Sequence, residues 1–179
     1  MNRMNKKTKK GFTLVETFIA ITVLIVSLVG PLSIAADSLK SAYYARDEIT
    51  AFYLAQEGLE YVRALRDQNY LASPAQPWLT GITDCLSSVG ANPPNVSCQV
   101  DFPNFSHSVC ANNLCTALVV DSNGLFNTQN GTKSNFTRTL TIVPVAGTSD
   151  EVAVGVTVSW VSAGINRSFK LSEHLFNWL

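Results

Sequence analysis

Histidine is scarce in this chain of 179 residues, which contains only His107 and His174. Histidine is the commonest metal ligand and a frequent general base. None of the familiar catalytic or phosphate-binding motifs, such as HExxH, GxSxG or the P-loop, surrounds either residue. We therefore expect a protein that is not an enzyme, with no metal site and no cofactor.

Charged residues are also few, at 15% of the chain against about 25% in ordinary domains. The formal net charge of zero hides an uneven division. Five basic residues precede Gly11: Arg3, Lys6, Lys7, Lys9 and Lys10. From Phe12 onward, 8 basic residues stand against 13 acidic ones, a net charge of −5. This acidic balance argues against a body that binds nucleic acid through a basic face, so we predict no nucleic-acid partner.

Residues 12–36 form an apolar stretch in which Glu16 is the one charged residue. As a helix, these residues would extend about 37 Å, enough for a bilayer core of about 30 Å. The basic residues in front of it would remain cytoplasmic under the positive-inside rule. The stretch is either a membrane helix or a secretory signal, which would be cleaved after Ala35. Neither a signal nor a plain anchor explains the carboxylate, which costs about 2.5–3.5 kcal/mol at a bilayer centre.

The segment Lys9-Lys10-Gly11-Phe12-Thr13-Leu14-Val15-Glu16 resembles the processing motif of type IV prepilins and pseudopilins. This resemblance implies that prepilin peptidase cuts after Gly11 and that the new N-terminal amine of Phe12 is methylated. It also implies that Glu16 pairs with the N-terminal amine of a neighbouring subunit. A carboxylate among apolar helices needs such an opposite charge.

The resemblance further implies the partners and the location of the chain. The partners would be prepilin peptidase, other pilin or pseudopilin subunits, and inner-membrane lipid. The chain would cross the cytoplasmic membrane once, with its N-terminus inside, and then enter an extracytoplasmic filament. The implied function is that of a structural minor pilin or pseudopilin in a type IV pilus or a type II secretion pseudopilus. The sequence does not distinguish between these two systems.

Residues 37–70 are predicted to continue the helix outward as an amphipathic helix. Apolar residues recur at helical spacing at Ile49, Phe52, Leu59, Val62 and Leu65, with Ala55 between them. Phe52 to Asp67 also resembles a stretch seen in many minor pilins and pseudopilins. The charged residues within it, Glu57, Glu60 and Arg63, fit a solvated helix face with i,i+3 ion pairs.

Residues 71–115 are rich in proline, serine and asparagine and predict a loop region with short strands, such as 97–102. All four cysteines lie here: Cys85, Cys98, Cys110 and Cys115. Their spacing does not match the paired CxxC pattern of zinc sites. We expect disulfides, with Cys85–Cys98 and Cys110–Cys115 favoured among the three possible pairings. Disulfides indicate an oxidising compartment.

Residues 116–179 predict an antiparallel sheet with its apolar face on the outer helix. The expected strands are 116–120, 136–143, 151–160 and 167–171. Asp121 begins a segment with some calcium-loop character that we interpret as a turn. The fold class is therefore α+β and pilin-like: a cleaved leader at 1–11, an apolar helix at 12–36, an outer helix at 37–70, the disulfide-pinned loops and the sheet.

Two other functions remain open. A membrane-anchored binding protein or adhesin would use the same anchor to present a ligand-binding head. A secreted enzyme with a cleaved signal would begin at Ala36 instead of Phe12, so the mass of the mature chain separates it from a pilin.

Overall fold

The structure is a computed structural model that describes residues 11–177. Its elements run α1 (Leu14–Leu71), η1 (Thr83–Cys85), β1 (Cys98–Asp101), β2 (Ser106–Val109), η2 (Ala111–Asn113), β3 (Val119–Val120), β4 (Phe126–Asn127), β5 (Thr132–Lys133), β6 (Thr137–Pro144), β7 (Glu151–Ser162) and β8 (Ile165–Phe176). The chain divides into two compact units, one ending at Tyr43 and one beginning at Tyr44. We call them the N-terminal unit and the head.

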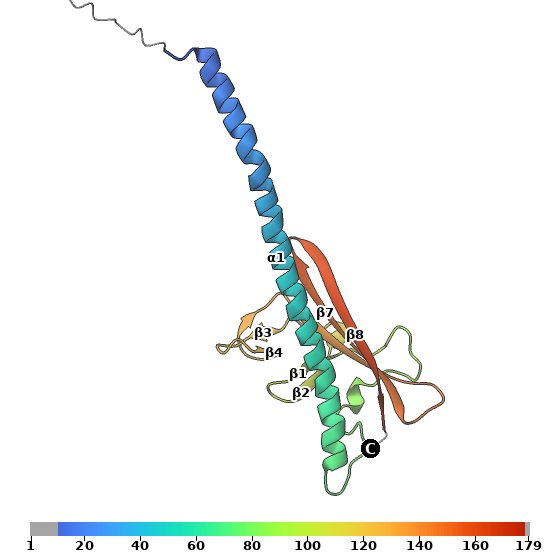
Figure 1. Cartoon of the computed structure of the whole chain (residues 1–179). Helices are drawn as coiled ribbons and strands as arrows, with labels where there is room; N and C mark the ends of the chain where they lie inside the picture. The colour runs from blue at the N-terminus through green and yellow to red at the C-terminus, as the bar shows by residue number, and fades with distance from the viewer. Residues whose placement is uncertain (1–10, 178–179) are drawn as a thin grey trace, which may run out of the picture. The chain divides into compact units, whose positions relative to one another are not determined.

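The N-terminal unit consists of the first half of α1 and the short segment before it (Figure 1). Thr13 precedes the helix, and its hydroxyl oxygen accepts the backbone N–H of Glu16 at 3.3 Å, as an N-cap does. Pro31 lies within the helix, where it lacks the N–H for one backbone hydrogen bond. The basic leader predicted at residues 1–10 lies outside the described residues.

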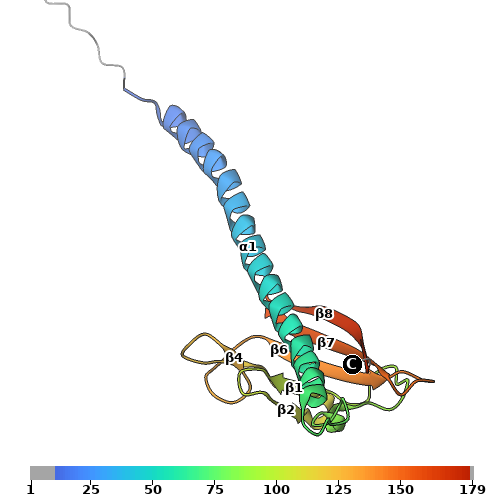
Figure 2. The same cartoon turned by 60° about the horizontal axis from the view of Figure 1, so that its bottom comes forward.

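The head is built on a five-stranded sheet of order β2-β1-β6-β7-β8, antiparallel at every pairing (Figures 1 and 2). β6, β7 and β8 form a meander joined by short turns, as the spacing of turn signals predicts. Ala163 and Gly164 make the two-residue turn between β7 and β8, and both have positive φ, at 51° and 78°. β1 confirms the strand expected near 97–102, and it lies beside β6.

The head part of α1 packs on one face of this sheet through small residues as well as large ones. Its buried positions include Ala51, Ala55 and Gly58. A Cβ on Gly58 would lie 3.0 Å from a methyl carbon of Val156, so glycine allows the helix to approach β7 closely. The predicted apolar face was partly wrong, because Ile49 is 57% exposed. Leu59 and Val62 are buried as expected, and the small residues are buried beside them.

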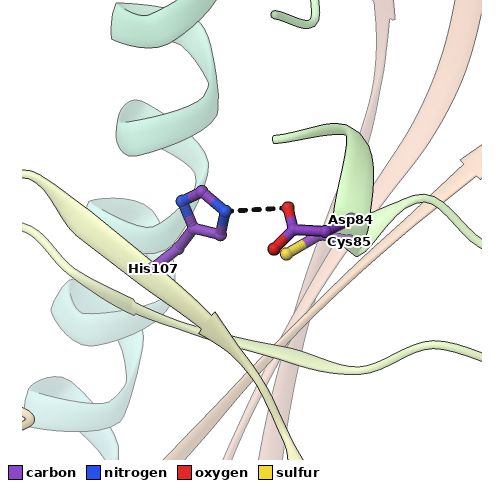
Figure 3. A group of neighbouring side chains, drawn as sticks. All are labelled: Asp84, Cys85 and His107. Carbon is purple, nitrogen blue, oxygen red and sulfur yellow. Dashed lines mark hydrogen bonds and ion pairs between the residues drawn. The ribbon is translucent and has the colours of Figure 1, made fainter. Parts of the chain in front are cut away.

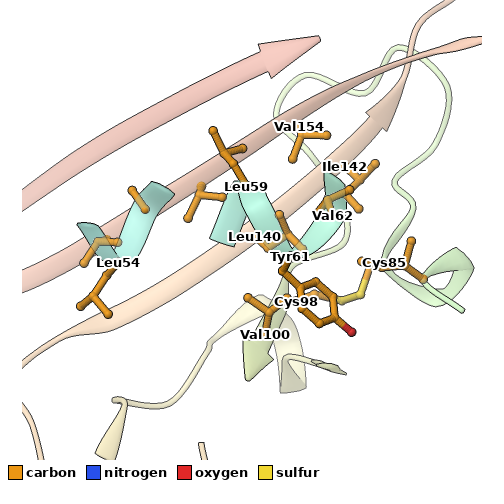
Figure 4. Close-up of a cluster of buried hydrophobic side chains, with 14 of the residues drawn as sticks. Leu54, Leu59, Tyr61, Val62, Cys85, Cys98, Val100, Leu140, Ile142 and Val154 are labelled. Carbon is orange, nitrogen blue, oxygen red and sulfur yellow. A yellow bond between two sulfur atoms is a disulfide. The ribbon is translucent and has the colours of Figure 1, made fainter. Parts of the chain in front are cut away.

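The core of the head lies between this helix and the sheet. Figure 4 shows Leu59 and Val62 of α1 against Ile142 of β6 and Val154 of β7. The disulfide Cys85–Cys98 is buried in the same cluster and joins η1 to β1. The second disulfide, Cys110–Cys115, closes the short loop around η2. Both expected pairings are therefore present, and all four sulfurs are bonded.

The strand predicted at 116–120 was wrong in extent and place. Only Val119–Val120 is a strand, and it belongs to a separate three-stranded sheet of order β4-β3-β5. The backbone of this segment bonds elsewhere: the carbonyl of Thr116 accepts a hydrogen bond from the side-chain amide of Gln99, and the N–H of Leu118 donates to the carbonyl of Phe136. The Asp121 carboxylate accepts the backbone N–H groups of Asn123 and Leu125, so the segment is a turn, as interpreted.

The fold class predicted from the sequence is confirmed: an α+β, pilin-like arrangement of a long N-terminal helix, an antiparallel sheet packed on it and a disulfide-pinned loop region. The loop region at 71–115 nevertheless contributes β1 and β2 to the main sheet.

Candidate functional site

The first candidate site is the start of the N-terminal unit, at Gly11, Phe12 and Glu16. Gly11 to Thr13 have no regular structure, and a side chain on Gly11 would meet no atom within 4 Å. Phe12 is 82% exposed. The peptide bond between Gly11 and Phe12 is therefore accessible in the isolated chain. Lys9 and Lys10 of the same motif lie outside the described residues.

The surface of this unit carries no charged residue between Thr17 and Ala36 and is mostly apolar there. None of the most apolar window of α1 is buried, and large side chains such as Phe18, Leu24 and Ile34 are more than half exposed. By length and composition this helix is able to span a membrane, and a secretory signal would pass the same test. So much apolar surface requires an apolar environment of lipid or of other helices.

Hydroxyl groups in the apolar part of the same helix are satisfied within it. Each donates to a backbone carbonyl three or four residues earlier at 2.8–3.0 Å, namely Thr17, Thr22, Ser27, Ser33 and Ser38. Intrahelical bonding of this kind lowers the cost of placing a hydroxyl in a non-aqueous environment. It makes the helix compatible with lipid or with a bundle of apolar helices.

Glu16 differs from these residues, since its carboxylate has no side-chain partner among residues 11–177. Its backbone N–H is used by the Thr13 cap, whereas the carboxylate lies on the exposed surface. A carboxylate three positions after the N-cap also interacts favourably with the positive end of the helix dipole. That interaction does not supply the full counter-charge that burial in an apolar environment would demand.

In the head, Asp84, Cys85 and His107 bring three possible metal-ligand atoms within 4.8 Å of one another (Figure 3). The sulfur of Cys85 is bonded to Cys98, so it is not a thiolate ligand. What remains is a chain of hydrogen bonds in which Nε2 of His107 lies 2.9 Å from Asp84 and Nδ1 lies 3.1 Å from the hydroxyl of Tyr61.

These two hydrogen bonds connect α1, β2 and η1. Burial raises the pKa of the Tyr61 hydroxyl, and the negative charge of Asp84 raises it further. A raised pKa disfavours the phenolate, so Tyr61 is poorly suited to act as a nucleophile or base. The arrangement fits a structural tie between helix and loop rather than a catalytic relay.

The three charged helix residues interpreted as a solvated face do not behave alike. Arg63 donates to Glu60 at 2.6 Å and also to Glu173 of β8. Glu57 instead turns toward the sheet and pairs at 3.1 Å with Arg138, whose side chain is fully buried. The solvated interpretation is therefore wrong for Glu57. Arg138 was missed, because a single arginine in a β-pattern carries no sign of its burial.

Comparison of the chain with protein-family models, curated proteins and solved structures found no match.

Proposed function

We propose that this chain is a structural subunit of the pilin type, a minor pilin or pseudopilin, and that it has no catalytic role. The observation that carries the proposal is the combination at the start of α1. An exposed apolar helix satisfies its own hydroxyl groups but leaves one carboxylate, Glu16, without a partner. The residues that precede it, Gly11 and Phe12, resemble the prepilin processing motif.

The physical argument concerns where such a carboxylate is tolerated. Lipid alone would penalise it, and a soluble protein would have no reason to keep the surrounding surface apolar. A bundle of identical or similar helices offers both an apolar environment and, if each chain begins at Phe12, a free amine near each Glu16. The pair would set the axial register between subunits more than it would add stability.

The proposed function implies three successive steps: membrane insertion, processing and assembly. The helix first anchors the chain in the cytoplasmic membrane with its N-terminus inside. Prepilin peptidase then removes residues 1–11 and methylates Phe12. The apolar helix finally leaves the lipid for the core of a type IV pilus or of a type II secretion pseudopilus. The disulfides in the head agree with assembly outside the cytoplasm.

The decisive experiment is the mass of the mature chain purified from its own membrane. A chain that begins at Phe12 and carries one added methyl group supports the proposal. A chain that begins at Ala36 identifies a secreted protein and rejects it. An uncleaved chain rejects the processing step.

The role of Glu16 is tested separately with Glu16→Ala, with Asp37→Asn as the matched control. Asp37 is an exposed carboxylate on the same helix, but it already pairs with Lys40 at 3.4 Å. We expect Glu16→Ala to be processed normally and to enter filaments poorly, whereas Asp37→Asn enters them as the unaltered chain does. Equal incorporation of both variants would contradict the pairing role.

A further inference from the structure

The face of the main sheet that α1 does not cover carries hydroxyl groups on three adjacent strands. The strand register places these side chains in rows that cross three strands. One row is Thr137, Ser159 and Ser168; the next is Thr139, Thr157 and Lys170; the third is Thr141, Gly155 and Ser172. We call the seven hydroxyl-bearing residues of these rows the hydroxyl face.

These hydroxyls are available for binding. All seven side chains belong to residues that are partly or fully exposed. Thr141 donates to the carbonyl of Gly155 at 3.1 Å. The other six have no side-chain hydrogen bond with any part of the chain between residues 11 and 177. Each retains one donor and two acceptor positions.

The hydroxyl face is hollowed at both ends. A cavity of about 400 Å³ lies at one end, where Thr141, Lys170, Ser172 and His174 surround Gly155. A second cavity, of about 450 Å³, adjoins the row of Thr137, Ser159 and Ser168. Residues 137–143 of β6 cover about 20 Å at the usual rise of a strand, so the two cavities and the rows between them form one extended strip.

Gly155 forms the floor of the first cavity. A Cβ at this position would lie 3.0 Å from the hydroxyl oxygen of Thr141 and 3.5 Å from Cε of Lys170. The lysine stem therefore extends over the glycine, and the missing side chain keeps the floor open. Lys170, Ser172 and Thr141 therefore line the same cavity around this glycine.

The ammonium group of Lys170 has no ion pair or ring contact with any residue from 11 to 177. In the head, the arginines are engaged: Arg46, Arg63, Arg66 and Arg138 with carboxylates and Arg167 with the ring of Tyr44. Lys133 and Lys170 have no such contact with any residue from 11 to 177. Of the other charged groups at the first cavity, His174 contacts Glu151 at 2.6 Å, and the carboxylate of Glu173 is taken by Arg63.

We propose that the hydroxyl face binds a carboxylate-bearing saccharide chain, with Lys170 as the contact to the carboxylate. Hydroxyl groups that are both donors and acceptors complement the hydroxyl groups of a sugar. An ammonium group with no internal partner complements its acid. The length of the strip suits an extended oligosaccharide rather than a single sugar.

Two other macromolecules fit the strip less well. A peptide is usually held by large apolar or aromatic anchors in pockets. The rows of the hydroxyl face present none, and the apolar lining of the first cavity, which includes Val143, Pro144 and Val145, has no aromatic residue. A nucleic acid requires several cations along its backbone, and the strip supplies Lys170 as its one unpaired cation among the described residues.

The test measures binding of tetragalacturonate to the full chain by isothermal titration calorimetry, in a detergent without a sugar headgroup. Maltotetraose serves as the neutral saccharide and tetraglutamate as the acidic peptide. Lys170→Met keeps most of the lysine stem and removes the charge. Lys133→Met is its matched control, because Lys133 is the other unpaired lysine and lies on β5, away from the strip. Thr157→Val removes a central hydroxyl at almost constant volume.

We expect tetragalacturonate to bind more tightly than either comparison ligand. Lys170→Met should weaken binding about tenfold, since a hydrogen bond to a charged group contributes roughly that much. Thr157→Val should weaken it several-fold, and Lys133→Met should leave it unchanged. The absence of binding, equal losses in the two lysine variants, or equal affinity for tetraglutamate or maltotetraose would overturn the proposal. None of these outcomes depends on where the mature chain begins, so the pilin proposal is tested independently.

Discussion

The ion pair of Glu57 with Arg138 allows a quantitative test of how α1 is held to the sheet. The Arg138 side chain is fully buried, and it donates to the carbonyl of Leu54 at 3.1 Å and to that of Val100 at 2.6 Å. Its Nε has no partner among the described residues. Burial lowers the pKa of the guanidinium, while Glu57 and then Asp101 act in the opposite direction.

Arg138 lies where the pairing between β1 and β6 ends, and its side chain connects these strands to α1. β1 pairs with β6 only at Cys98 and Leu140. Continued antiparallel pairing would bring Val100 opposite Arg138, and the Arg138 guanidinium donates a hydrogen bond to the Val100 carbonyl. Arg138 therefore fastens β1, β6 and α1 at one point. Its charge depends on a carboxylate that is itself only 26% exposed.

The perturbation is Glu57→Gln, which keeps the shape of the side chain and removes the charge. Breaking a buried pair leaves an uncompensated charge and costs about 3–5 kcal/mol, and the partial exposure of Glu57 places the expected loss near the lower limit, at about 3 kcal/mol. The matched control is Glu60→Gln, three residues along the same helix. Glu60 pairs with Arg63 at 55% exposure, so its loss should cost about 0.5 kcal/mol or less.

The assay is urea unfolding of the full chain in detergent micelles with both disulfides intact, followed by circular dichroism in the near ultraviolet. A double variant, Glu57→Leu with Arg138→Met, removes both charges and should be more stable than Arg138→Met alone or Glu57→Gln alone. Equal small losses for Glu57→Gln and Glu60→Gln would refute the reasoning. They would mean that backbone carbonyls alone satisfy the buried guanidinium.

Three further predictions rest on single sites. Gly11→Val should block maturation, and a mature chain of that variant still beginning at Phe12 by mass spectrometry would contradict the processing assignment. Burial alone would raise the pKa of Asp101, but hydrogen bonds from Thr128 and Asn104 hold it below its ordinary 3.8. The stabilisation, about 2 kcal/mol, should be complete above about pH 5 and disappear as the pH falls through the lowered pKa. Unfolding curves of the unaltered chain and Asp101→Asn should therefore converge only in acid. Ala163, at a φ of 51°, occupies a conformation that asparagine or glycine adopts more readily, so Ala163→Asn should stabilise the head by about 1 kcal/mol and Ala163→Val should destabilise it, with both measured by thermal unfolding.

Much of the head could be predicted because local patterns and tertiary structure agree. β7 alternates apolar and polar residues from Glu151 to Trp160, and its register with β6 and β8 follows from short turns. The cysteines paired as their proximity suggested. The buried helix face was predicted only in part. Ala55, Leu59 and Val62 are buried as expected, whereas Ala51 and Gly58 are small residues with little apolar surface of their own to mark them.

The hydroxyl face could not be predicted from the sequence either, because it depends on the register of three strands. Each strand shows ordinary outward threonine and serine residues, which are common on the exposed side of any antiparallel sheet. Only the register aligns Thr139 of β6 with Thr157 of β7 and Lys170 of β8. A property that arises from three strands together is invisible in the pattern of any one of them.

Glu16 and Arg138 show a further limit of prediction from the sequence, one for an acidic residue and one for a basic residue. Each is a single charge in an apolar sequence pattern, and local sequence gives no way to tell what neutralises it. For Arg138 the fold supplies Glu57 from a distant part of the chain, and the charge is satisfied within one molecule. For Glu16 no described residue fills that role. If the apolar surface around Glu16 is buried in use, the counter-charge has to come from another molecule, and this requirement supports a subunit of an assembly more directly than the apolar helix does.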